Sequence, residues 1–66
     1  MFRFEIGANI LIKSYKRPDY DPLEVKILGK APNKIKAEIL SDGWFARGSI
    51  HILTGAEWYP IGRIKV

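Results

Sequence analysis

The chain has 66 residues, of which 47% are hydrophobic and 27% are charged, and it contains no cysteine. Eleven Lys and Arg residues against seven Asp and Glu residues give a formal net charge of +4. This length accommodates one domain with one small core, and it excludes an enzyme that carries its own cofactor domain. Without cysteine, a disulfide scaffold, a thiolate metal site and a cysteine nucleophile are all excluded.

The hydropathy pattern predicts a globular domain over residues 1–66 without a membrane partner. The longest apolar runs, such as Ile10 to Ile12, hold only three residues, far fewer than a membrane span requires. Charged residues at positions 3 and 5 interrupt the apolar core that a signal peptide needs. We therefore expect a cytoplasmic protein.

Alternating apolar and charged residues predict extended strands. Phe2, Phe4 and Ile6 alternate with charged residues at the start of the chain. The same pattern recurs over 23–28, 34–40 and 64–66. Such alternation places apolar side chains on one face of a strand and charges on the other. Many β-branched isoleucines also favour strands, so we predict an all-β fold.

Turn-forming residues separate the predicted strands. The segment 14–22 contains Pro18 and Pro22 and is predicted to be a long irregular loop. The segment 29–33 is typical of a five-residue hairpin loop. Asp42-Gly43 lies between two apolar runs and is the strongest hairpin signal, predicting a two-residue type I′ turn.

This order of elements resembles a small SH3-like barrel of the Tudor or KOW type. The resemblance implies a first barrel strand over 10–13, the long loop over 14–22, a meander over 23–28, 34–40 and 44–48, a short turn over 59–63 and a closing strand over 64–66. The segment 49–57 fits poorly, because Ile50, Ile52 and Leu53 require an additional strand. An OB-like five-stranded barrel is the alternative, and neither fold implies a particular ligand.

Residues for catalysis are scarce in this sequence. His51 is the only histidine and has no acidic or histidine partner nearby in sequence, so we expect it to face outward from a strand. Asp19, Asp21 and Glu24 are interpreted as solvated carboxylates, because a calcium loop needs more oxygen donors and a central glycine. We expect neither an enzyme nor a bound metal or cofactor.

The first candidate binding feature is the loop that contains Tyr15, Lys16, Arg17 and Tyr20. Aromatic rings that stack on bases, together with cations that neutralise phosphates, are typical of single-stranded nucleic-acid binding. Tyr and Arg are also the usual hot-spot residues of protein interfaces. Alternatively, the two tyrosines pack over an open end of the barrel.

The second candidate is a basic face of the meander. Lys26, Lys34 and Lys36 are predicted to project from neighbouring strands on the side opposite the isoleucines. They would contact nucleic acid through phosphates and without sequence preference. Glu24 and Glu38 share that face, so cross-strand Glu–Lys pairing is the alternative interpretation.

The third candidate is a group of adjacent aromatic residues. Neighbouring residues of a strand face opposite sides, so one member of each adjacent pair is expected at the surface. An exposed aromatic ring beside an arginine is typical of a recognition surface. Coverage by a loop or by a homodimer interface is the alternative. The residues concerned are Trp44 with Phe45, Trp58 with Tyr59, and the arginines Arg47 and Arg63.

Together these features predict a non-catalytic binding module that contacts nucleic acid through a basic face and an aromatic, basic loop. A basic isoelectric point near 9.6 favours this hypothesis. The alternative is a protein–protein interaction module, such as a small inhibitor or adaptor encoded by a phage or mobile element. The sequence leaves open whether the protein is a monomer or a homodimer.

Overall fold

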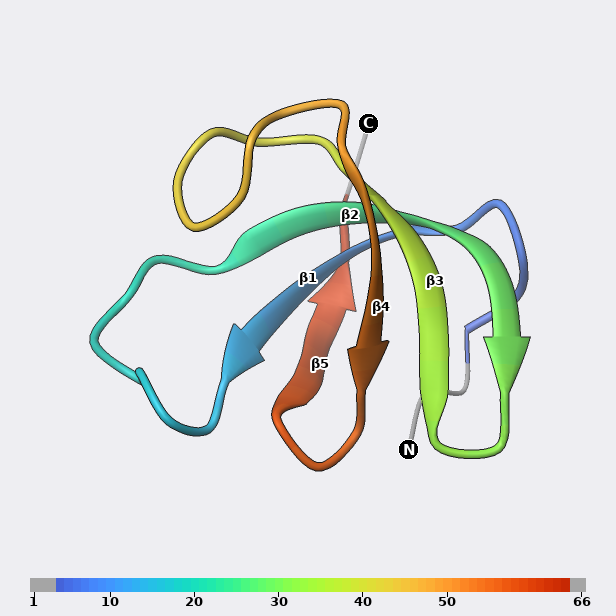
Figure 1. Cartoon of the computed structure of the whole chain (residues 1–66), viewed down its shortest axis with the longest axis horizontal. Coiled ribbons are helices and arrows are strands. Elements are labelled where there is room, and N and C mark those ends of the chain that lie inside the picture. Colours follow the sequence, from blue (N-terminus) through green and yellow to red (C-terminus); the bar gives the residue numbers. More distant parts are fainter. Residues whose placement is uncertain (1–3, 65–66) are drawn as a thin grey trace.

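A computed structural model describes residues 4–64, and they form an all-β structure of five antiparallel strands (Figure 1). The order across the sheet is β4-β3-β2-β1-β5, so β1 to β4 are neighbours in chain order, while β5 pairs with β1 and not with β4. The strands are β1 (Asn9–Ser14), β2 (Leu23–Ala31), β3 (Lys34–Ile39), β4 (Ile50–Thr54) and β5 (Trp58–Arg63).

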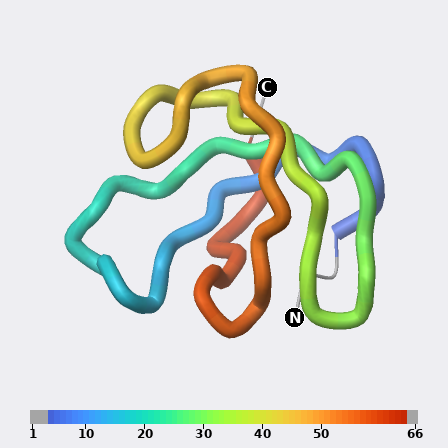
Figure 2. Tube along the Cα trace, in the orientation of Figure 1, coloured from blue at the N-terminus to red at the C-terminus, as the bar shows by residue number. Residues whose placement is uncertain are grey.

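The sheet is strongly curved, and its curvature is concentrated in β2. Figures 1 and 2 show β2 as an arch that extends from the long loop 15–22 to the hairpin that leads into β3. The register between β2 and β3 shifts between Ile27 and Gly29. A bulge of this kind bends its strand and increases the local twist. The fold is therefore compatible with a small barrel-like architecture.

The core lies on the concave face and follows the predicted alternation. Every second residue of β1 and β3 is buried, and so are Leu23, Val25 and Ile27 in the first part of β2, because side chains alternate between the faces of a strand. The last two strands each add one large buried side chain. The buried apolar residues are Ile10, Ile12, Leu23, Val25, Ile27, Ile35, Ala37, Ile39, Leu53 and Trp58.

The predicted hairpin at Asp42-Gly43 and the predicted strand over 44–48 are both wrong. Residues 40–49 form an irregular connection between β3 and β4. A type I′ turn needs positive φ at both central residues, whereas among these two only Gly43 has one, at 142°. The additional strand required by Ile50, Ile52 and Leu53 is confirmed as β4.

The predicted loop over 29–33 is also shorter in the structure. Gly29 to Ala31 belong to β2, and Ala31 pairs with Lys34, so only Pro32 and Asn33 make the turn. The backbone N–H of Gly55 donates a hydrogen bond to the Asn33 carbonyl at 2.9 Å. The hairpin tip is thereby fixed to the turn between β4 and β5.

The C-terminal part was predicted as a short turn over 59–63, and this prediction is wrong. Those residues belong to β5, which pairs with β1. Pro60 is tolerated because β5 is an edge strand and its register shifts beside Ile12. Of the predicted closing strand over 64–66, Ile64 follows β5 outside any strand, and residues 65 and 66 lie outside the described part.

The alternating N-terminal segment does not form a strand where it is described. Phe2 lies outside the described residues, and residues 4–6 are irregular. Phe4 packs against the core, whereas Ile6 is exposed. Gly7, with φ of 94°, donates a backbone hydrogen bond to Ile27 at 2.7 Å. The turn at this glycine therefore directs the chain away from a strand before β1 begins.

Candidate functional site: an aromatic groove

A groove of about 870 Å³ lies between the loop 15–22 and the start of the connection 40–49. Trp58 of β5 and Leu23 of β2 contribute to it from the core side. We call this the aromatic groove. Its lining residues are Ser14, Lys16, Arg17, Asp19, Tyr20, Asp21, Pro22, Leu23, Asp42, Gly43, Trp44 and Trp58.

Three aromatic side chains in contact give the groove its apolar surface. The rings of Tyr20 and Trp44 meet edge-on with centroids 4.8 Å apart, and Trp44 and Trp58 do so at 5.5 Å. Trp58 is only 7% exposed, whereas Tyr20 is 41% and Trp44 is 40% exposed. The groove therefore has a buried aromatic side and two exposed rings that remain accessible to a ligand.

Backbone hydrogen bonds hold the loop 15–22 beside the groove. The N–H of Tyr15 donates to the Glu57 carbonyl at 2.9 Å, and that of Lys16 donates to Ser14 Oγ at 3.2 Å. Within the loop, the Tyr20 N–H donates to the Arg17 carbonyl at 3.1 Å. The position of the Tyr20 ring is thus set by a turn inside the loop and by an anchor at its base.

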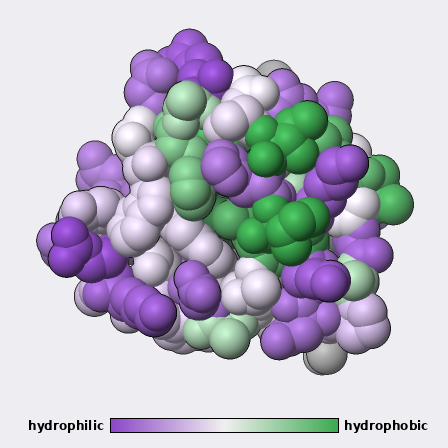
Figure 3. Space-filling view, in the orientation of Figure 1, coloured by the Kyte–Doolittle hydropathy of each residue, from purple (hydrophilic) through white to green (hydrophobic). Residues whose placement is uncertain are grey.

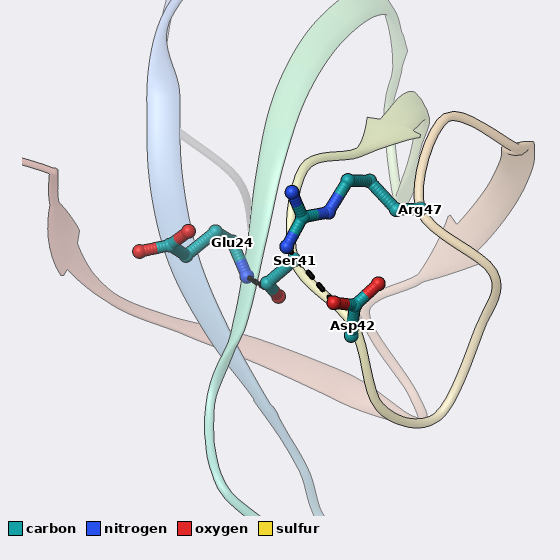
Figure 4. Close-up of polar contacts among 4 residues, drawn as sticks. All are labelled: Glu24, Ser41, Asp42 and Arg47. Carbon is teal, nitrogen blue, oxygen red and sulfur yellow. Dashed lines mark hydrogen bonds and ion pairs between the residues drawn. The ribbon is translucent and has the colours of Figure 1, made fainter.

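The opposite wall is anchored to the first residues of β2 (Figure 4). The Glu24 N–H donates to Ser41 Oγ at 3.1 Å, and the Leu40 N–H donates to the Glu24 carbonyl at 2.7 Å. Farther along, Arg47 forms an ion pair with Asp42 at 2.9 Å. These contacts hold the segment that carries Trp44 against the sheet.

The groove carries charges of both signs. Lys16 and Arg17 line it together with the three carboxylates Asp19, Asp21 and Asp42. The guanidinium of Arg17 donates to the Tyr20 hydroxyl at 2.8 Å and lies 4.8 Å from the centroid of that ring. This hydrogen bond raises the pKa of Arg17 above its already high ordinary value. Arg17 is therefore a permanent cation that also orients Tyr20.

Tyr15, which the sequence placed with Tyr20, does not line the aromatic groove. Its ring pairs with that of Tyr59 at 4.6 Å between centroids. Tyr59 lies opposite Lys13 of β1. The loop tyrosines thus belong to two separate aromatic pairs, and Tyr15 stays mostly exposed instead of covering the core.

The three predicted lysines are exposed on β2 and β3, away from the aromatic groove. Lys26 lies opposite Glu38, but within residues 4–64 no lysine lies within 4.0 Å of a side-chain carboxylate. Lys34 and Lys36 belong to β3, and the β2–β3 hairpin and the loop 15–22 lie on opposite sides of the molecule (Figure 1). The aromatic, basic loop and the basic face, which were predicted to contact nucleic acid together, therefore lie on separate surfaces of the structure.

The Trp44–Phe45 pair is divided as predicted, although it lies outside any strand: Trp44 is exposed while Phe45 packs against the core. In the second pair Trp58 is buried and Tyr59 is half-buried, so neither ring is fully exposed. The prediction for His51 is wrong. His51 does not face outward; it is half-buried and stacks on Phe45 with centroids 4.1 Å apart. Its Nε2 lies 2.9 Å from Ser49 Oγ. Its position on the side of Leu53 explains this, since alternate residues of β4 share a face.

The two candidate arginines are not equivalent. Arg47 reaches the groove wall through its ion pair with Asp42. Arg63 instead pairs with Glu5 at 3.1 Å and lies 5.3 Å from the centroid of the Phe4 ring. Arg63 is therefore associated with the N-terminal segment, and it does not line the groove.

Sequence reasoning missed that Asp19, Asp21 and Asp42 converge on the aromatic groove. The first two lie in the long loop and the third lies far along the chain, so only the fold brings them together. The available signal was Asp42, which precedes Gly43 and Trp44, but an Asp-Gly pair is also typical of a tight hairpin.

Among residues 4–64, no cluster of three or more potential ligand side chains could hold a metal ion. In the same range, no helix is long and apolar enough to cross a membrane. Comparison with protein-family models, with curated proteins and with solved structures finds no match. The structure itself defines the class of protein: it is an all-β protein with a five-stranded antiparallel sheet.

Proposed function

We propose that the protein is a small interaction module whose aromatic groove binds an extended peptide segment of a partner protein. The observation that carries this proposal is the contact between the exposed rings of Tyr20 and Trp44 over buried Trp58. Rigid aromatic side chains supply a large contact area at a low cost in conformational entropy. An aromatic-lined groove is also a common means of holding an extended segment.

The charges around the groove favour a peptide over a polyanion. Three carboxylates and two cations line it, and Arg17 is already engaged with Tyr20. Phosphates that enter this groove would meet Asp19 and Asp21, and like charges repel. A peptide that combines apolar or proline residues with a basic side chain packs its apolar residues on the aromatic rings and pairs its basic side chain with these carboxylates.

Single-stranded nucleic acid is the second candidate ligand of the same groove. The exposed faces of Tyr20 and Trp44 beside Lys16 favour it, because bases stack on accessible rings and phosphates pair with cations. On this alternative, affinity falls steeply as the salt concentration rises. A peptide held mainly by aromatic contacts loses much less affinity under the same change.

The finer fold assignment that we propose is an SH3-like barrel. Strands β1 to β4 are neighbours in chain order, and β5 pairs with β1 at the other edge of the sheet. This four-stranded meander supports an SH3-like barrel, whereas an OB-fold is a Greek-key barrel in which the order is rearranged. The aromatic groove then lies between the loop that follows β1 and the connection that follows β3.

The proposal is tested by selecting short random peptides from a phage-displayed library on the immobilised protein. Selected peptides should bind the unmodified protein, and Trp44→Ala should weaken binding by roughly thirtyfold, the effect of losing a hot-spot side chain worth about 2 kcal/mol. Tyr15→Ala is the matched control, since it removes an exposed aromatic ring outside the groove.

Oligothymidylate is titrated in parallel at low and physiological salt. Peptide enrichment that depends on Trp44 supports the proposed function. Failure to enrich peptides, combined with oligothymidylate binding that Trp44→Ala abolishes, would show that the groove binds single strands. Equal losses in the Trp44 and Tyr15 variants would contradict the assignment of the site to the groove.

A further inference from the structure

A second surface lies on the outer face of the sheet where β3 and β4 are paired. Lys36 lies opposite Ile52, and Lys34 lies opposite Thr54. Ile50 follows the same outward alternation on β4. We call Lys34, Lys36, Ile50 and Ile52 the lysine–isoleucine face. None of these residues lines the aromatic groove.

The two isoleucines are unusually exposed for residues of a strand. Ile50 is 54% and Ile52 is 59% exposed, although the same strand buries Leu53. Figure 3 shows strongly hydrophobic atoms gathered over β4 and bordered by hydrophilic ones. Neighbouring exposed apolar side chains with a polar border are typical of a surface that binds a partner.

A shallow hollow of about 200 Å³ lies beside Ile52. The hollow exists because small residues of β2 lie beside long side chains of β3. Gly29 is paired with Lys36, and Ala31 is paired with Lys34. Ile52 lines the hollow on the β4 side. An apolar side chain of a partner therefore has room between the lysine stems.

The lysines of this face are free to bind an external anion. Within residues 4–64, the ion pairs shorter than 4.0 Å are Arg47–Asp42 and Arg63–Glu5, and neither involves Lys34 or Lys36. Both lysines are exposed. They stand about 4.8 Å from the isoleucine row, the usual spacing of neighbouring strands. One ligand can therefore contact both rows at once.

We propose that the lysine–isoleucine face binds an acidic amphipathic helix of a partner protein. Ile50 and Ile52 are about 7 Å apart along their strand, close to the spacing of about 6 Å between helix residues four positions apart. The apolar stripe of such a helix packs on the isoleucines. Its flanking carboxylates then pair with Lys34 and Lys36.

Charge and chemistry disfavour the other occupants of this face. In a second copy of the chain, a symmetric contact brings the lysines of both copies together, and like charges repel. Nucleic acid gains little from exposed isoleucines, since bases stack on aromatic rings. The described outer face of β3 and β4 offers no aromatic side chain on which a base could stack.

The proposal is tested by titrating the full chain with a model helical peptide built from leucine and glutamate, and following backbone amide shifts by NMR. A matched peptide of leucine and lysine serves as the charge control. The acidic peptide should shift amides in β3 and β4, and the basic peptide should bind at least about tenfold more weakly. Shifts confined to the aromatic groove would overturn the proposal.

Variants then separate a specific site from general charge attraction. Ile52→Asp, and the double change Lys34→Glu with Lys36→Glu, should each weaken binding of the acidic peptide by about tenfold or more. Lys13→Glu with Arg63→Glu makes the same change in net charge on β1 and β5, at residues that line neither the aromatic groove nor the hollow, and should alter binding by less than about threefold. Equal losses in both lysine pairs would contradict the assignment.

Two further measurements address the alternative occupants. Oligothymidylate should leave the amides of β3 and β4 unshifted, and shifts there of the same size as those with the acidic peptide would overturn the proposal in favour of nucleic acid. The spectrum of the free protein should not change with its concentration. Concentration-dependent shifts confined to β4 would instead assign the face to self-association.

Discussion

The indole rings of Trp58 and Trp44 meet at 75° with centroids 5.5 Å apart, and one is buried while the other is exposed. The hydrophobic core therefore extends without interruption into the proposed binding surface. A ligand that contacts Trp44 rests on a side chain whose position is set by packing. This pre-organisation lowers the entropy cost of binding.

The buried member of this pair should dominate stability. Trp58→Ala is expected to lower the free energy of unfolding by about 3–5 kcal/mol, because it removes a large core side chain and leaves a cavity. Trp44→Ala should cost less than about 2 kcal/mol, since that ring is substantially exposed. Urea denaturation followed by circular dichroism measures both. Similar losses for the two variants would contradict the difference in burial.

Neighbouring strands offer a comparison of an inward and an outward isoleucine. Ile35 of β3 is 1% exposed, whereas Ile52 of β4 is mostly exposed. Ile35→Ala should lower the free energy of unfolding by about 2–5 kcal/mol, and Ile52→Ala should change it by less than about 1 kcal/mol. Thermal and urea unfolding provide the measurement. A large loss for Ile52→Ala would indicate that this side chain is buried in solution.

The contact between Ser41 and β2 should position the wall that carries Trp44. Ser41→Ala leaves the Glu24 N–H without its hydroxyl acceptor and is expected to cost about 1–2 kcal/mol of stability. The exposed Arg47–Asp42 pair should contribute less than about 1 kcal/mol in a double-mutant cycle. If the ion pair proves stronger than the Ser41 contact, this order of importance is wrong.

Gly48 is required for its backbone conformation. Its φ of 87° lies in the left-handed region, and its N–H donates to the Ile39 carbonyl at 2.8 Å. Gly48→Ala should therefore destabilise the fold by about 1–2 kcal/mol, although the space around it is open. Gly62→Ala is the control, since Gly62 is equally open and has no positive φ; it should leave stability unchanged or raise it slightly.

The sequence predicts those parts of the fold where alternation and burial coincide. Ile10, Val25 and Ile35 lie on the predicted strands, and each is buried as expected. The long loop was also located correctly, because its prolines cannot continue a central strand. Local pattern was sufficient for these elements, since the same side chains define both the strand and the core.

Elements whose conformation depends on distant packing could not be predicted locally. The turn signal at Asp42-Gly43 was overridden because Phe45 packs on the core and Ile50 begins the next strand farther along. The segment 59–63, which contains Pro60, was predicted as a turn, but pairing with β1 at a sheet edge accommodates the proline in a strand. The groove itself depends on contacts between segments far apart in sequence, which no local spacing reveals.

The pairing of β1 with β5 also determines the order in which the chain can assemble. The tight turn at Pro32 and Asn33 lets β2 and β3 meet early, because closing a short loop costs little entropy. Ile12, in contrast, has Pro60 as its partner on its other side. During synthesis on a ribosome, one edge of β1 therefore remains unpaired until almost the whole described chain has been synthesised. The apolar residues beside that edge remain accessible to chaperones during this interval.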